Sequence, residues 1–185
     1  TSILIPRFDL PMENASVMVS LIPFFTVIFA PLFGSLVDKV GKGTRWMITG
    51  SILVLISHLM IAFAPQGVQT YGYIAIAMLG VGYSLVPAAL WPTVSKIVPE
   101  KNLGTAYSLI YWIQNMGMLT VPIVIGLIFK SEVLTAGNQA QELSAAIHSE
   151  FVFIALSTAA IIVSICYAKA SDKHPEMELD KPASE

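Results

Sequence analysis

Residues 34–46 read Gly-Ser-Leu-Val-Asp-Lys-Val-Gly-Lys-Gly-Thr-Arg-Trp, a short segment rich in glycine and charge. A long apolar run precedes this segment and another follows it. Two apolar runs joined by a tight polar turn are typical of neighbouring membrane helices. Basic residues are concentrated in cytoplasmic loops of membrane proteins, so Lys39, Lys42 and Arg45 indicate that this turn lies in the cytoplasm.

The composition supports a membrane protein. The chain has 185 residues, of which 55% are hydrophobic and only 12% are charged, whereas soluble domains carry about 25% charged residues. The formal net charge of −2 gives no basic field for a nucleic-acid partner. The single cysteine, Cys166, cannot build a disulfide framework or a cysteine-based zinc site.

Five apolar segments are long enough to be membrane spans, which need roughly 20 residues. Backbone groups in lipid have no water to bond, so these segments must be helices. The sequence therefore predicts an all-α membrane protein with five transmembrane helices. Its acidic and basic residues fall outside the spans or, for Lys96 and Glu150, at their ends. The predicted spans are 16–37, 46–64, 70–97, 103–129 and 150–168.

The distribution of Lys and Arg predicts the orientation. Successive loops must alternate between the two sides, which puts loops 38–45 and 98–102 and the tail after 168 together. The other side receives only Arg7 and Lys130, two of the ten basic residues, so the first side is predicted to be cytoplasmic. The eight basic residues on that side are Lys39, Lys42, Arg45, Lys96, Lys101, Lys169, Lys173 and Lys181.

The remaining segments are predicted as connections. Residues 1–15 are interpreted as the end of a preceding helix and an extracytoplasmic linker, which suggests a piece of a longer protein. The five-helix portion occupies 16–170. The polar stretch 131–149 is predicted to form a short interfacial helix. The charged segment 171–185 is predicted to be a disordered cytoplasmic tail.

Several motifs resemble the C-terminal half of transporters of the major facilitator superfamily. They are the loop 34–45, the run from Pro87 to Glu100, Leu103-Gly-Thr-Ala-Tyr and Ile113-Gln-Asn-Met-Gly. The resemblance implies two six-helix bundles around a central cavity that work by alternating access, with the five spans forming most of one bundle. The partner would be an N-terminal six-helix bundle. The branch of the superfamily that these motifs resemble implies small peptides as substrates, moved without an obligatory ion.

The resemblance also implies a gate in the loop. Asp38 would lock it from beside the start of the helix near residues 102–104, because a carboxylate is stabilised at a helix N-terminus. The alternatives are a solvated loop acid for Asp38 and simple orientation signals for the basic residues. The candidate gating residues are Gly34, Asp38, Lys39, Gly41, Lys42 and Arg45.

Polar and aromatic side chains of the third and fourth spans are candidates for lining the substrate cavity. Amides are costly in hydrocarbon, so they should face protein or water. The alternatives are hydrogen bonds between helices and, for Trp91, anchoring at the membrane interface. The candidate cavity residues are Tyr83, Trp91, Tyr107, Tyr111, Gln114 and Asn115.

His58 is the ionisable residue inside the second span, and we expect a neutral imidazole bonded to a neighbour. The three histidines are scattered, and no pattern indicates a metal site, a catalytic nucleophile or a cofactor. The predicted function is transport of a small organic solute, such as a short peptide, across the bilayer; in a bacterium this would be the inner membrane. A membrane-embedded enzyme is disfavoured because paired acids and a Ser/His arrangement are missing. A non-transporting scaffold or receptor of the same fold stays open.

Overall fold

The computed structural model describes residues 1–133 and 138–182, and these residues form helices joined by short connections. The five long helices are each long and apolar enough to cross a membrane. This confirms the predicted all-α class and the five spans, although the helices extend beyond the predicted bounds. The elements are α1 (Leu4–Phe8), α2 (Met12–Val40), α3 (Gly43–Phe63), α4 (Gln69–Ile97), η1 (Glu100–Asn102), α5 (Leu103–Val133), α6 (Gln139–Lys173) and η2 (Pro175–Met177).

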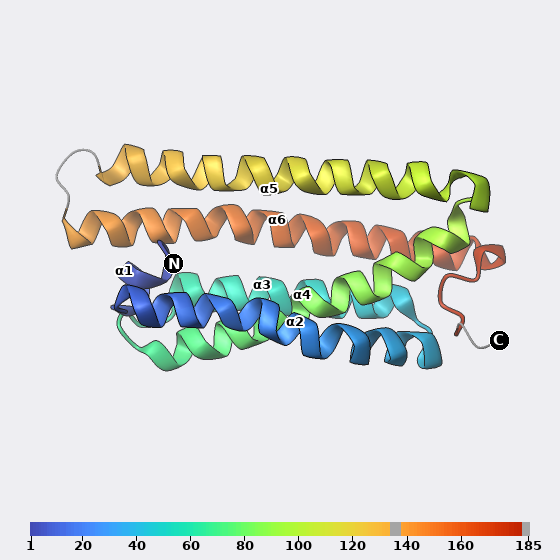
Figure 1. The fold of residues 1–185 in the computed structure, drawn as a ribbon, viewed down its shortest axis with the longest axis horizontal. Helices are drawn as coiled ribbons and strands as arrows, with labels where there is room; N and C mark the ends of the chain where they lie inside the picture. Colours follow the sequence, from blue (N-terminus) through green and yellow to red (C-terminus); the bar gives the residue numbers. More distant parts are fainter. Residues whose placement is uncertain (134–137, 183–185) are drawn as a thin grey trace.

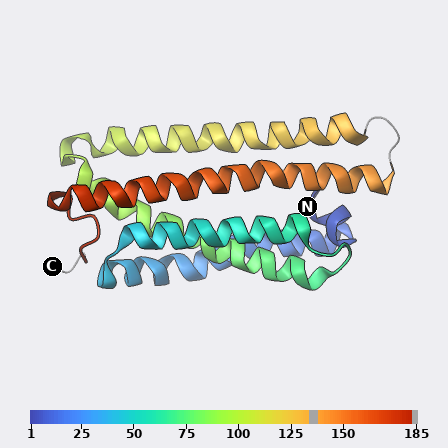
Figure 2. The same cartoon turned by 180° about the vertical axis from the view of Figure 1, so that it is seen from behind.

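The long helices run up and down, so that the connections alternate between two ends (Figure 1). The α2–α3 turn, residues 98–102 and the tail 174–182 lie together at one end, which we call the basic end. Helix α1 and the α3–α4 loop lie at the opposite end. Both views place α5 beside α6, with α3 on the other side of α6 (Figure 2). Helix α4 packs against α3 and α2.

The main apolar core lies toward the end opposite the basic end. Phe8 of α1 and Met18 of α2 are fully buried there, against Ile61 of α3 and Ile76 of α4. By contrast, none of the residues of α5 is buried. Helix α5 therefore presents apolar surface that only lipid or another protein segment can cover.

The predicted interfacial helix over 131–149 is wrong for the residues that the structure describes. Helix α5 continues to Val133, and α6 already begins at Gln139; residues 134–137 lie outside the described residues. The Asn138 side chain accepts a hydrogen bond from the Gln141 N–H (3.0 Å) and caps α6. At about 1.5 Å per residue, α6 is much longer than a bilayer core, so its polar first turns can project beyond the hydrocarbon.

The prediction for the tail also differs from the structure. Residues 171–173 complete α6, and residues 175–177 form η2. Leu179 is only 4% exposed, which gives the charged tail an apolar anchor. Residues 174–182 therefore pack against the basic end of the bundle, whereas residues 183–185 lie outside the described residues.

Candidate functional site

A cavity of about 690 Å³ lies among α3, α4, α5 and α6. Tyr83 of α4 and Gln114 of α5 line it, so two predicted cavity residues share one space. Ser51 of α3 and Ser157 of α6 add hydroxyl groups, although the Ser157 hydroxyl donates to its own helix at Phe153 O (2.8 Å). The rest of the wall is mostly apolar, as in many small-molecule sites.

Three other predicted cavity residues form an aromatic cluster nearer the basic end. The Trp91 ring of α4 stacks on Tyr111 of α5, with centroids 5.1 Å apart, and lies 5.6 Å from the Tyr107 ring. Aromatic pairs at these separations stabilise helix contacts. Because α4 and α5 otherwise make few contacts, this cluster is a principal link between them.

Asn115 is placed differently from its neighbour Gln114. Its Nδ2 donates to Tyr111 O one turn earlier on the same helix (2.8 Å). Asn115 does not line the cavity that Gln114 lines. The Asn115 amide therefore bonds to its own helix, whereas the adjacent Gln114 side chain lines the cavity among the helices.

The predicted gating loop forms a close contact with the C-terminal tail. Gly41 ends α2 with φ 68°, a conformation that glycine adopts readily. A β-carbon at Gly41 would lie 2.3 Å from Asp180 O. The next residue, Lys42, donates its N–H to the same carbonyl (2.8 Å). Glycine at position 41 thus permits the tail to lie directly on the loop.

Asp180 supplies the cap for α3 from far along the chain. Its Oδ1 accepts the Thr44 N–H (2.9 Å) and its Oδ2 accepts the Thr44 hydroxyl (2.8 Å). The residue at the N-cap position, Lys42, makes no side-chain cap. A carboxylate at a helix N-terminus satisfies free N–H groups and favours the helix dipole.

Lys96, at the end of α4, holds the same segment from the other side. Its Nζ donates to the carbonyls of Glu178 and Lys181, both at 2.9 Å. The Lys181 ammonium donates to the Glu178 carboxylate (2.5 Å) and holds the pKa of that carboxyl below its usual value. Residues 178–181 therefore form a clamp between the α2–α3 turn and the end of α4.

The other predicted gating residues lie around this contact. Asp38, Lys39, Lys42 and Arg45 are exposed, while Gly34 lies mid-helix in α2 with open space at its β position. Among the described residues, no hydrogen bond or ion pair joins Asp38 to residues 102–104, the helix start that the resemblance implies. The structure thus brings Asp180, a residue that the sequence motif does not contain, to the loop.

A buried pair of polar side chains, His58 and Glu150, lies toward the end of the bundle opposite the basic end. Neither residue is among the predicted site residues. The sequence predicts that Glu150 lies at the end of a span, but in the structure it lies well inside α6 and is 2% exposed. It pairs with His58 of α3, which confirms a bonded histidine (Nδ1–Oε2 2.7 Å). Burial lowers the pKa of the nearby Arg7, and the charge of Glu150 opposes that shift. Within 1–133 and 138–182, no cluster of three His, Cys, Asp or Glu side chains suits a metal.

Comparisons with known proteins agree with this architecture. The family model described as Major Facilitator Superfamily matches residues 3–185, and the chain belongs to this family of multi-pass membrane proteins. Curated relatives include the chicken (Gallus gallus) "Lysosomal dipeptide transporter MFSD1", 41% identical over 124 residues, which cover 67% of this chain and 27% of the relative. The human (Homo sapiens) protein of the same name is 38% identical over 125 residues, covering 68% and 26%.

A bacterial protein also matches. The "Uncharacterized MFS-type transporter YwoD" of Bacillus subtilis is 22% identical over 131 residues, 70% of this chain and 29% of that protein. The aligned part of the chain spans about a quarter of the length of these curated relatives. The resemblance to the major facilitator superfamily is therefore confirmed, and the activity of the whole protein is a matter for proposal.

We expect Asp180→Ala to release the tail from the α2–α3 turn. The substitution removes the side-chain cap at the start of α3, and loss of such a cap costs about 0.5–2 kcal/mol. Hydrogen exchange of the full-length protein should show faster exchange in residues 42–46 and 178–182. Asp172→Ala is the matched control, because Asp172 is exposed and, among the residues that the structure describes, forms no hydrogen bond or ion pair with the loop. Equal exchange in the two variants would contradict the capping role.

Proposed function

We propose that this chain forms part of a transporter that moves a small organic solute, such as a short peptide, across a membrane by alternating access. The observation that carries the proposal is the cavity shared by Tyr83 and Gln114 in a chain of the major facilitator superfamily. Transporter sites of this kind lie between helices near the middle of the membrane, where two repeats meet.

Gln114 is the residue that would recognise a peptide-like solute. Its amide offers both donors and an acceptor, which match a peptide bond or a terminal carboxylate. It is exposed in this chain on a helix without a single buried residue. A six-helix N-terminal bundle of the same protein would face that side of α5 and complete the cavity.

The basic end would be the cytoplasmic end. Eight of the ten Lys and Arg residues belong to it, and cytoplasmic loops carry such an excess. Asp38, Lys39 and Arg45 would then act at a cytoplasmic gate, next to the clamp formed by residues 178–181. Opening of this gate would have to move the α2–α3 turn together with the tail.

The proposal is tested by uptake of a labelled dipeptide into liposomes that contain the full-length protein. Gln114→Ala should weaken dipeptide binding by several-fold, because a lost hydrogen bond costs about 0.5–1.5 kcal/mol. Asn115→Ala is the matched control, since the Asn115 amide bonds its own helix and its removal should leave affinity almost unchanged.

The same experiment separates the alternatives. Transport through this cavity would be supported if uptake exceeds that of protein-free liposomes and if Gln114→Ala lowers it selectively. Dipeptide binding without uptake would favour a receptor or scaffold of the same fold. Equal affinity of the Gln114→Ala and Asn115→Ala variants would remove Gln114 from the binding site.

A further inference from the structure

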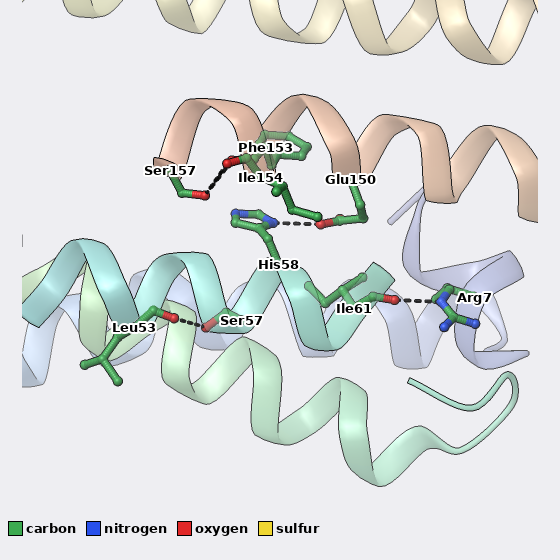
Figure 3. A network of polar contacts seen from close by, with 9 residues as sticks. All are labelled: Arg7, Leu53, Ser57, His58, Ile61, Glu150, Phe153, Ile154 and Ser157. Carbon is green, nitrogen blue, oxygen red and sulfur yellow. Dashed lines mark hydrogen bonds and ion pairs between the residues drawn. The ribbon is translucent and has the colours of Figure 1, made fainter. Parts of the chain in front are cut away.

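His58 and Glu150 form a buried titratable pair between two of the membrane-crossing helices. The imidazole of α3 and the carboxylate of α6 point toward each other across the helix contact (Figure 3). Their Nδ1 and Oε2 atoms are 2.7 Å apart, and the residues are 8% and 2% exposed. Phe153 of α6 stacks on the imidazole, with ring centroids 4.8 Å apart and planes 6° from parallel.

The surroundings of the pair are almost entirely apolar. His58 and Glu150 line a cavity of about 310 Å³, whose other walls from α2, α4 and α5 are aliphatic. These walls are Val19, Ile22, Ile76, Leu79, Val121, Pro122 and Ile125. Burying an ionisable side chain in such surroundings costs free energy, and in membrane helices such residues often mark ion and proton pathways.

One further charged side chain, that of Arg7, faces this region. Arg7 of α1 interacts electrostatically with Glu150, but its guanidinium donates to the carbonyls of Ile61 and Ala62 at the end of α3 (2.6 and 3.0 Å). The imidazole is therefore the nearest partner of the carboxylate, and the cavity is large enough to admit water.

We propose that His58 and Glu150 bind a proton inside the membrane, and that its occupancy controls the α3–α6 contact and hence the rate of transport. The proton enters from the aqueous phase through water in the cavity, which is left unchanged, and it is held between Nδ1 and Oε2. With this proton the pair has no net charge and links the two helices. Without it, a buried carboxylate faces a neutral imidazole, and the link is weakened because an incompletely paired buried charge is costly.

This inference rests on the proposed transport function and adds a pH dependence to it. The proton sets the rate and does not have to be carried with the solute. A bound proton is lost as pH rises, so we expect uptake to fall with rising pH, by up to about tenfold per pH unit once the site empties, as for a single bound proton.

The test compares two pairs of the same chemistry in the full-length protein. One variant carries His58→Gln and Glu150→Gln together, because two amides can keep a hydrogen bond at these positions without titrating. The control carries His148→Gln and Glu132→Gln, which replace an exposed His–Glu pair between α6 and α5 (2.6 Å). Dipeptide uptake is measured from pH 5 to 8, with equal pH inside and outside the liposomes.

Proton binding is measured separately, by infrared difference spectra of the carboxyl and imidazole bands over the same pH range. The double variant at 58 and 150 should lose the pH dependence of uptake and the corresponding bands, whereas the control pair should keep both. An unchanged pH profile or unchanged bands in the 58/150 variant would overturn the proposal. If the wild-type protein takes up no solute, the transport function fails, and the infrared titration still decides whether the pair binds a proton.

Discussion

Replacement of Gly82 by valine should force α3 and α4 apart and strongly reduce the amount of folded protein. A β-carbon at Gly82 would lie 2.9 Å from the carbonyl oxygen of Gly50 and 3.0 Å from the Val54 side chain. The contact is reciprocal, because a β-carbon at Gly50 would lie 2.7 Å from Val86 and 3.2 Å from the Gly82 carbonyl. Small residues let membrane helices approach this closely.

The clash at Gly82 is with backbone, which cannot rotate away as a side chain can. We therefore expect a destabilisation at or above the upper end of about 1–3 kcal/mol, the usual cost of overpacking. Thermal unfolding of the detergent-solubilised full-length protein measures it. Gly126→Val is the control, because a β-carbon at Gly126 in α5 meets nothing within 4 Å. Similar unfolding temperatures for the two variants would mean that α3 and α4 do not pack through these glycines.

The helices themselves were accessible from the sequence because hydropathy is a local property. Each span is a continuous apolar run, and a run of that length has few alternatives in a bilayer. The alternation of the loops follows from the number of crossings alone. The helix ends are harder to predict, because the turns after Asn138 contain no continuous apolar run. Their helical conformation becomes evident only from the structure, where Asn138 caps a helix that begins at Gln139.

The contact between the loop and the tail and the buried His58–Glu150 pair each join residues that are far apart in the sequence. Asp180 lies 136 positions after Thr44, and a charged, proline-containing tail gives no sign that its aspartate caps a distant helix. The loop motif instead predicts a gating role for Asp38, whose side chain is exposed. Glu150 is separated from His58 by 92 positions, and its place next to a polar stretch suggested a helix end. Tyr83 and Gln114 can be picked out as candidates from the sequence because amphipathic residues are rare within apolar spans, and the structure places both on one cavity wall.

The role of Arg7, at the other end of the bundle, also depends on residues that are far away in the sequence. In the sequence it is simply one of two basic residues assigned to the extracytoplasmic side. In the structure it is 5% exposed, and its guanidinium donates to the carbonyls of Ile61, Ala62 and Ala64. The last carbonyls of a helix lack partners within the helix, so Arg7 serves as the cap for the end of α3. Its own carbonyl accepts the Gly67 N–H (3.2 Å) of the α3–α4 loop.

We therefore expect Arg7→Met to destabilise the protein severely. The three carbonyl groups belong to residues that are 9% exposed or less, and each buried acceptor left without a donor costs about 1–3 kcal/mol. The loss should exceed about 3 kcal/mol on that basis, with a smaller loss for Arg7→Lys, which keeps the positive charge at the helix C-terminus. Thermal unfolding of the full-length protein in detergent gives the comparison. Lys130→Met removes the other cation assigned to this side, from an exposed position on α5, and should change the unfolding temperature little. If Arg7→Met proves as stable as Lys130→Met, the cap of α3 does not depend on Arg7.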